Sequence, residues 1–478
     1  MQPGPHSGMR SLVIYHSINT STDLPKKKKN SFSIHPLVHA WAKLRLESEP
    51  EMEMEITSKV LKTIASAVHS SDERPTEDWI FEQRVMPHID AVTKHMTEYN
   101  EVSSMDFHDE SYILGSLYWR HARHNQALEW YGRALAGQEK ALGVDHPRTL
   151  NAVSCMASVF NKQGQYDKAL EWYGRALAGQ EKAVGVDHPD TLTIVHNMAL
   201  VFDNQGKYAK ALEWYGRGLA GQEKALGVDH PDTLTTTYSM ASLFKDQGKY
   251  DKALEWCSRA LAGYEKALGM DHPNTLNAVS CMASVFYKQG QYDKALEWYG
   301  RALAGQEKAV GVDHPETLTI VHNMALVFDN QGQYAKALEW YGRGLAGYEK
   351  ALGPDHPDTL NTVHNMAVVF GNQGQYITAQ DWYGRALAGY EKALGLDHPD
   401  TLNTMHNMAV VFENQGQYIT AQDWYGRALA RYEKVLGVNH PLTQGTLRCL
   451  IDFHERTGQT EQAQMLRARL HVPNGPSN

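Results

Sequence analysis

The sequence predicts an all-α solenoid assembled from tandem helix-turn-helix units, and two observations lead to this fold class. The first is a tryptophan at every 42nd position along most of the chain, with a His-Pro pair that keeps the same step. A period of roughly 20–50 residues is typical of solenoids, propellers and arrays. The second is the helical spacing of apolar side chains inside one unit. The tryptophans are Trp130, Trp172, Trp214, Trp256, Trp298, Trp340, Trp382 and Trp424, and the histidines are His146, His188, His230, His272, His314, His356, His398 and His440.

Each unit predicts two antiparallel helices. In the unit from Thr191 to Pro231, apolar side chains first stand at i, i+3, i+4 and i+7, which is one face of a helix. A second stripe of this kind follows Gly206, where Ala, Leu, Glu, Lys and Gln, which favour helices, dominate. No period-2 alternation is present, which argues against the strands of a propeller blade. The first stripe consists of Val195, Met198, Ala199 and Phe202.

The loop between units predicts where one helix ends and the next begins. Gly227 follows the second helix, where a left-handed residue commonly ends a helix. Asp229-His230-Pro231-Asp232 then opens the next helix. Proline suits the first helical turn, and aspartates suit the positive end of the helix dipole. We therefore interpret the repeated Asp-His-Pro loop as a helix-start signal.

The unit resembles the tetratricopeptide repeat (TPR) in its large and small packing residues. It departs from that family at Val153 and Ala157, which stand where the family has Trp and Gly, and it lacks the closing proline. With a second helix about two turns longer and the LG-x-DHP loop, it is similar to the kinesin light chain type of TPR. The resemblance implies a right-handed superhelix that binds peptides or proteins in its concave groove. It rests on Met156, Ala157, Phe160, Gly164, Tyr166, Ala169, Tyr173 and Ala176.

The repeat also predicts the domain boundaries. Eight 42-residue units occupy residues 106–441, and a capping helix pair occupies 442–471, as Thr443 to Thr457 and Gln459 to His471. This last pair ends in basic residues, as a solubilising cap does. We expect a flexible arm over residues 1–30 and a flexible tail over 472–478.

Residues 31–105 predict a small helical region with a resemblance of its own. The segment Ser31 to Arg45, SFSIHPLVHAWAKLR, resembles the end of the winged-helix region of fungal NLR-like proteins. The helices that follow, around Trp79 and Met86, resemble the connector of those proteins, which join an NB-ARC or NACHT switch to a TPR array. No G-x-x-x-x-G-K-[ST] motif is present to hold a nucleotide. The resemblance implies the C-terminal part of such a protein, either naturally short or a truncated gene model.

The composition and net charge of the chain limit the classes of partner that it is expected to bind. Hydrophobic residues make up 42% of the chain, which supplies a packed core. A net charge of −9 argues against nucleic acids and anionic membranes as partners. No leader sequence and no apolar run of about 20 residues stand out. We expect a cytoplasmic protein, and we interpret the four lysines Lys26 to Lys29 as solvated charge, with a nuclear signal as the alternative.

The cysteines predict neither a disulfide framework nor a metal site. There are four, and they are scattered, which suits a reducing compartment. Cys155 and Cys281 match because they occupy the same place in copied units, and three units separate them, which is beyond disulfide reach. The other two are Cys257 and Cys449.

We expect no catalysis, no cofactor and no metal. Neighbouring Asp and His on one turn seldom converge on one ion, and the next unit lies roughly 8–10 Å or more away. No Ser/His/Asp or Cys/His nucleophile pattern is present. The tryptophans stand among core positions of the second helix, so we assign them to packing between helices, not to ligand stacking.

The face of the first helix opposite its core is predicted to line the concave groove. At about 100° per residue, Thr193, Asn197, Leu200 and Asn204 centre roughly 180° from the apolar stripe. Asparagine offers donors and acceptors, which suits the backbone of an extended peptide, and the kinesin light chain resemblance implies groove-facing asparagines here. An ordinary solvated face remains the alternative. The predicted groove residues are Asn197, Asn204, Asn323, Asn330, His364, Asn365, Asn372, His406, Asn407 and Asn414.

These observations predict a non-catalytic scaffold that binds peptide or protein partners, as the sensor or interaction arm of an NLR-like protein. Two other classes stay open. One is a cargo adaptor similar to kinesin light chain, although residues 54–69 supply only about two heptads of coiled coil where three or four are expected. The other is a fragment of a signalling NTPase.

Overall fold

The computed structural model describes residues 107–470 and, before them, positions 62, 63, 65, 66, 82, 85–91 and 93. The chain divides into two compact units, Met1–Ser66 and Ala67–Asn478, and everything below concerns the second. The predicted arm 1–30, the predicted tail 472–478 and most of the NLR-like segment 31–105 lie outside the described residues.

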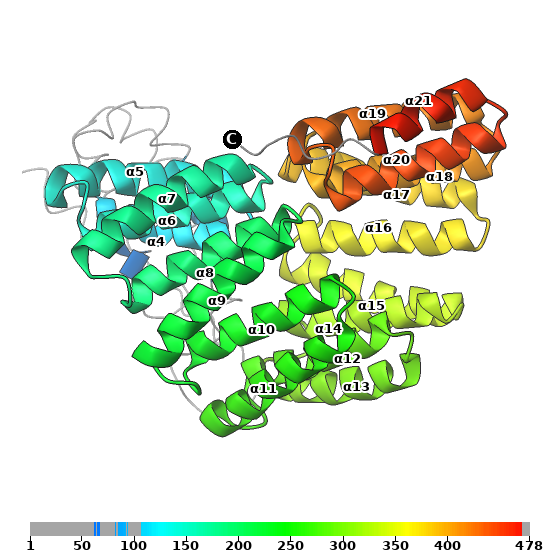
Figure 1. The fold of residues 1–478 in the computed structure, drawn as a ribbon. Helices are drawn as coiled ribbons and strands as arrows, with labels where there is room; N and C mark the ends of the chain where they lie inside the picture. The colour runs from blue at the N-terminus through cyan, green and yellow to red at the C-terminus, as the bar shows by residue number, and fades with distance from the viewer. Residues whose placement is uncertain are drawn as a thin grey trace, which may run out of the picture. The chain divides into compact units, whose positions relative to one another are not determined.

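Residues 107–470 fold into eighteen helices and no strand, which confirms the predicted all-α solenoid of tandem repeats (Figure 1). The helices are α4 (His108–Arg120), α5 (His124–Leu142), α6 (Pro147–Lys162), α7 (Tyr166–Ala183), α8 (Pro189–Asn204), α9 (Tyr208–Ala225), α10 (Pro231–Asp246), α11 (Tyr250–Leu268), α12 (Pro273–Lys288), α13 (Tyr292–Ala309), α14 (Pro315–Asn330), α15 (Tyr334–Ala351), α16 (Pro357–Asn372), α17 (Tyr376–Ala393), α18 (Pro399–Asn414), α19 (Tyr418–Leu436), α20 (Pro441–Arg456) and α21 (Thr460–Leu470).

Consecutive helices pair into the units that the period predicts. Units 1 to 8 are the pairs from α4 and α5 to α18 and α19, and α20 with α21 forms the closing pair. The first helices of successive units, α6 to α18, also contact one another directly, and more closely than the second helices do. The first helices therefore line the concave side, and we call α6, α8, α10, α12, α14, α16 and α18 the inner row.

The Asp-His-Pro loop starts each first helix through its histidine. In every unit from α6 to α20 the proline is the first helical residue, and the imidazole Nδ1 of the preceding histidine accepts the N–H of the residue after the proline, at 3.1–3.3 Å. At α10, for example, Asp232 N donates to His230 Nδ1 at 3.2 Å. The proline and the aspartates predicted the start of each first helix. The structure adds the cap made by the histidine side chain, which the sequence did not predict.

In units 2 to 8, two glycines per unit supply the positive φ angles that the turns need. Gly206 has φ +67° between the helices of unit 3, and Lys207 N bonds back to the carbonyl of Phe202 at 2.8 Å. Gly227 has φ +96° after the second helix. Both positions were predicted as helix breaks, and residues with a Cβ adopt this backbone only with strain.

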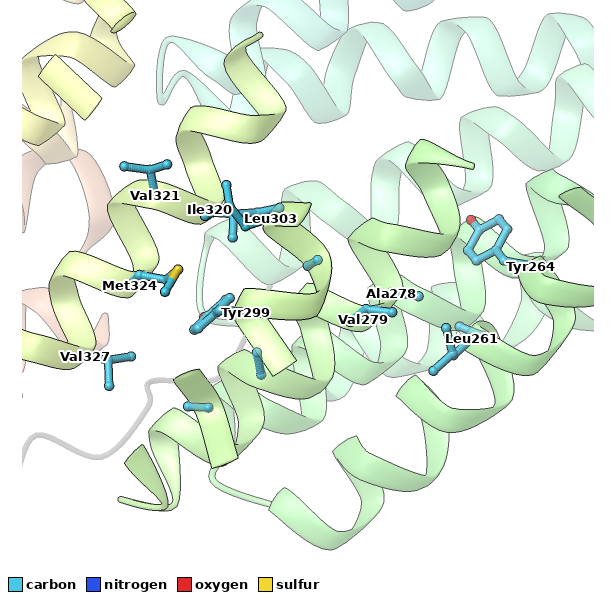
Figure 2. Close-up of a cluster of buried hydrophobic side chains, with 14 of the residues drawn as sticks. Leu261, Tyr264, Ala278, Val279, Tyr299, Leu303, Ile320, Val321, Met324 and Val327 are labelled. Carbon is cyan, nitrogen blue, oxygen red and sulfur yellow. The ribbon is translucent and has the colours of Figure 1, made fainter. Parts of the chain in front are cut away.

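The core consists of tyrosines and small residues, repeated in each unit. Tyr299 is 2% exposed and packs with Leu303 against Ile320 and Met324 of the next unit, as Figure 2 shows. The tryptophans pack as predicted, although only Trp130 is fully buried, at 1% exposure. The other seven lie against a phenylalanine of their unit's first helix, with ring centroids 5.8–6.2 Å apart.

The four scattered cysteines were not expected to form a disulfide framework, but one pair of them is bonded. Cys257 of α11 and Cys281 of α12 form a disulfide, with Cα atoms 6.4 Å apart and both side chains buried. Cys257 stands where the other units have the core tyrosine, and the corresponding tyrosines face the first helix of the next unit. The packing therefore places these two thiols together, whereas Cys155 and Cys449 are free.

Candidate ligand-binding groove

All ten predicted groove residues lie on the inner row, on α8, α14, α16 and α18. The asparagines that end these helices are exposed. Those in the middle of the helices are partly buried, and so is His406. His364 differs, because it is only 6% exposed and lies beneath the groove surface. The exposed set is Asn204, Asn330, Asn372 and Asn414, and the partly buried asparagines are Asn197, Asn323, Asn365 and Asn407.

A chain of hydrogen bonds joins units 6 and 7 beneath this surface. The Asn365 amide Nδ2 donates to His322 Nε2 at 3.1 Å. Because Nε2 accepts, the ring proton must be on Nδ1, which lies 3.1 Å from Thr362 Oγ1 and donates to it. The Thr362 hydroxyl in turn donates to the carbonyl of Asp358 at 3.1 Å. Each polar atom along this chain is therefore satisfied.

The same arrangement joins units 7 and 8. Asn407 Nδ2 donates to His364 Nε2 at 2.9 Å, and His364 Nδ1 lies 2.9 Å from Thr404 Oγ1. Thr404 then donates to the carbonyl of Asp400 at 2.8 Å. We call these two chains the Asn-His-Thr relays. They show that His364 supports Asn407 from below, where the sequence had placed it on the groove surface.

The relay histidines are held neutral. Burial lowers the pKa of His322 and His364 to about 4, so both rings are uncharged at neutral pH. Each ring also meets a core tyrosine edge-on, His322 at Tyr341 and His364 at Tyr383, with centroids 5.2 Å apart. A neutral ring with one donating and one accepting nitrogen is what the relay requires.

The relays leave part of each asparagine for a ligand. Asn365 Nδ2 donates both to His322 and to Asn361 Oδ1, the latter at 3.1 Å. Its two N–H groups are thereby used, and its orientation is fixed, while the side-chain oxygen can accept a hydrogen bond. Asn365 therefore presents an oriented side-chain carbonyl group on the inner row.

The ends of the inner-row helices carry a second set of contacts between units. Asn204 donates to Asn161 at 3.0 Å, Asn330 to the Tyr287 hydroxyl at 2.8 Å, and Asn372 to Asp329 at 3.3 Å. The accepting partner occupies the same position in each unit, yet its identity changes from unit to unit. At that position the chain has Asn161, Asp203, Lys245, Tyr287, Asp329, Gly371 and Glu413.

Sequence reasoning missed this variable position, although aligning the units by their 42-residue step would have revealed it. Burial raises the pKa of Asp203 to about 6, and the neighbouring Asp246 adds to the rise. Burial also raises the pKa of Asp329. In contrast, Glu413 pairs with Arg456 at 2.6 Å and accepts from the Tyr425 hydroxyl at 3.0 Å. The groove thus offers a different charge at each step along one row.

Within the part of the chain that the structure describes, no three His, Cys, Asp or Glu side chains gather in a way that could hold a metal ion.

A family model described as tetratricopeptide repeat matches residues 148–224, 204–266, 232–280, 275–350, 330–392 and 358–434, which together span more than half of the chain. The chain belongs to the tetratricopeptide repeat family. A second model of the same description matches residues 113–148, in unit 1 of this TPR array. Among curated proteins, none matches the chain.

Several solved structures are similar to this TPR array. Nearly identical TPR-like repeats from a Podosopora anserina protein named after kinesin light chain are 27% identical, with 43% of this chain and 97% of that chain covered and a TM-score of 0.36. BtubC (BKLC) from P. vanneervenii is 19% identical, with 51% and 96% covered and a TM-score of 0.38. A Rap protein complexed with competence and sporulation factor is 14% identical, with 80% and 99% covered and a TM-score of 0.53, which shows a shared fold.

Proposed function

We propose that the protein is a non-catalytic scaffold that binds an extended peptide or protein segment along its inner row. The observation that carries this proposal is the pair of Asn-His-Thr relays, which fix Asn365 and Asn407 in the same orientation in neighbouring units. Oriented amide oxygens at a repeated spacing match the repeated N–H groups of an extended backbone. Proteins built from this repeat are generally scaffolds without catalytic activity.

The variable position supplies the specificity in this proposal. The relays would hold a ligand's backbone, which is common to all peptides, while Asp203, Lys245, Asp329 and Glu413 would meet its side chains. Charges of both signs along one row select a partner with the complementary order of charges. The Rap structure was solved with competence and sporulation factor, so a solenoid of this fold holds a partner in that protein.

Within this function, we propose the role of the sensor or interaction arm of an NLR-like protein. The support is the sequence of residues 31–105, with its likeness to a winged-helix end and connector. A cargo adaptor similar to kinesin light chain and a fragment of a signalling NTPase are the alternatives. Co-sedimentation with a kinesin heavy chain would favour the adaptor, and genomic sequence upstream of Met1 would test for a lost domain.

The proposed partners are proteins or peptides, without nucleic acid or membrane, and the proposed location is the cytoplasm. The net charge of −9 supports the exclusion of nucleic acids and anionic lipids. None of the helices that the structure describes is long and apolar enough to cross a bilayer.

A matched pair of variants tests the groove. A peptide selected from a displayed random library by the full chain serves as the probe, and its Kd is measured by calorimetry. Asp203→Asn with Asp329→Asn removes two charges from the inner row, and Glu213→Gln with Glu339→Gln removes two exposed charges from the second helices of the same units. We expect the first pair to change the Kd about tenfold or more, which is about 1.4 kcal/mol, and the second to leave it unchanged. Equal effects of the two pairs would refute binding along the inner row.

A further inference from the structure

Contacts between units far apart in sequence bring two parts of the solenoid together. The Nε2 atom of His398, at the start of α18, lies 3.0 Å from the carbonyl oxygen of Lys162 at the end of α6. One unit further on, His440 Nε2 lies 3.4 Å from the carbonyl of Asn204. In both pairs 236 residues separate the partners, so the contact repeats with the period of the array.

The helix caps fix which way these hydrogen bonds run. His398 Nδ1 accepts the N–H of Asp400, and His440 Nδ1 accepts the N–H of Leu442, both at 3.2 Å. In a neutral imidazole whose Nδ1 accepts, Nε2 carries the proton. Both histidines therefore donate through Nε2 to the carbonyl of the distant unit, while they cap their own helices through Nδ1.

The turns between the helices of units 2 and 3 fit this contact closely. A Cβ added to Gly164 would lie 3.1 Å from Pro399 Cδ, and one added to Gly206 would lie 2.8 Å from Pro441 Cδ. The equivalent glycines of units 4 to 8 have no such neighbour within 4 Å. They are Gly248, Gly290, Gly332, Gly374 and Gly416.

The loop histidines on the side of the distant contacts are also more buried than those that only cap their helices. The His188 and His230 side chains, which only cap their helices, are 41% and 39% exposed. The His356 and His398 side chains are 9% and 11% exposed. His356 also lies close enough to His121 of unit 1 for the two rings to interact electrostatically.

We propose that these contacts form an intramolecular latch that closes the solenoid on itself. The latch consists of the His398–Lys162 and His440–Asn204 hydrogen bonds and of Pro399 and Pro441 seated on Gly164 and Gly206. It joins units 2 and 3 to the starts of α18 and α20, so it sets the spacing between successive turns of the array. Loss of the latch would let those turns separate without unfolding any unit, because the apolar core of each unit is shared with its neighbours along the array.

A cleft of about 500 Å³ remains between the two sides, lined by Tyr166, Lys168, Leu396 and Val435 among others. Any effect of the latch on access of a ligand to the inner row rests on the function proposed above. The latch itself is a property of the ligand-free chain, so it is tested without a ligand.

Glycine variants give a matched test by small-angle X-ray scattering of the full chain. Gly164→Ala with Gly206→Ala places a methyl group against both prolines, and Gly290→Ala with Gly332→Ala introduces the same backbone strain at φ +74° and +72° with no neighbour. We expect a larger radius of gyration for the first pair only, with equal helical circular dichroism in both. An unchanged radius of gyration in the first pair, or an equal rise in both, would overturn the latch.

A second pair keeps the test valid if the glycine variants fold poorly. His398→Asn with His440→Asn retains a good helix cap but removes the Nε2 donor, and His188→Asn with His230→Asn does the same where no distant carbonyl is in contact. We expect expansion and faster amide exchange in the turns of units 2 and 3 for the first pair alone. The same scattering curve and exchange rates in both pairs would contradict the proposal.

Discussion

Single side chains couple several neighbouring units on the inner row. Asn365 and Asn407 each lie 43 residues after the histidine that accepts their hydrogen bond, and each histidine lies 40 residues before its threonine. The sequence indicated that these asparagines were unusual for a helix interior, because asparagine is a weak helix former. It did not reveal the relay, because the partners come from different units and meet only after the array has packed.

The relay changes what an asparagine variant should do to stability. Asn365→Ala with Asn407→Ala removes the donors to His322 and His364, at about 0.5–1.5 kcal/mol for each bond, and the better helix propensity of Ala offsets part of this. We expect a net loss of roughly 1–2 kcal/mol in the free energy of unfolding, measured by urea denaturation. Tyr383→Ala, at a core position that is 3% exposed, should cost about 3–5 kcal/mol. If the asparagine pair costs nothing, the relays do not couple the units.

The relay histidines also predict a pH dependence. The pKa of His322 and His364 is about 4 in the folded chain and near 6.5 when unfolded, so the unfolded state binds more protons between these values. The free energy of unfolding should therefore fall as the pH is lowered from 6.5 to 4, by up to about 1.4 kcal/mol per pH unit for each histidine.

Thermal melts at pH 7 and pH 5 check this slope. His322→Gln with His364→Gln should reduce the slope, whose remainder comes from other buried histidines such as His196, with a pKa lowered to about 4. His188→Gln with His230→Gln, at exposed caps, should leave the slope unchanged. Equal slopes in both pairs would show that the relay histidines are not the groups that titrate.

The helices themselves followed closely from the sequence. The 42-residue step and the i, i+3, i+4, i+7 stripe predicted both helices of each unit, and Gly206 and Gly227 marked where they end. These signals are local, so one sequence is enough to detect them. The histidine caps, the Cys257–Cys281 disulfide and the latch were missed because they depend on how a side chain is directed or on partners brought together by packing.

Removing whole elements tests the modular packing. Deletion of unit 7, Asp358–Pro399, joins units that differ from it at few positions, since units 7 and 8 share all but six of 42 residues. We expect a soluble protein with unchanged helicity per residue by circular dichroism. Deletion of Asp358–Asn372 alone removes nearly all of α16 and leaves α17 without its partner, so helicity should fall sharply. Similar losses in the two deletions would mean that the units are not independent.

The disulfide between α11 and α12 is checked by alkylation. When the purified chain is unfolded without reductant, iodoacetamide should label Cys155 and Cys449 only, and reductant should expose Cys257 and Cys281 as well. Cys281→Ser should free Cys257 for labelling without reductant. Labelling of all four cysteines in the oxidised protein would contradict the bond.

At the scale of the whole molecule, the array presents two surfaces with different tasks. The second helices of units 1 to 7 carry a repeated ladder of arginine–glutamate pairs between units, such as Arg301 with Glu265 at 3.0 Å. The inner row changes its side chains from unit to unit. An even outer surface and a varied inner one suit a scaffold that reads one partner along its length, and the latch would hold that inner surface at a fixed curvature.

Hydrogen–deuterium exchange of the full chain, with and without the selected peptide, tests the central claim most directly. The account predicts slower exchange on α8, α14, α16 and α18, in the segments around Asn197, Asn323, Asn365 and Asn407, and unchanged exchange on α9, α15, α17 and α19. Protection confined to the second helices, or to the loops between units, would show that the partner binds elsewhere and that the inner row is not the binding groove.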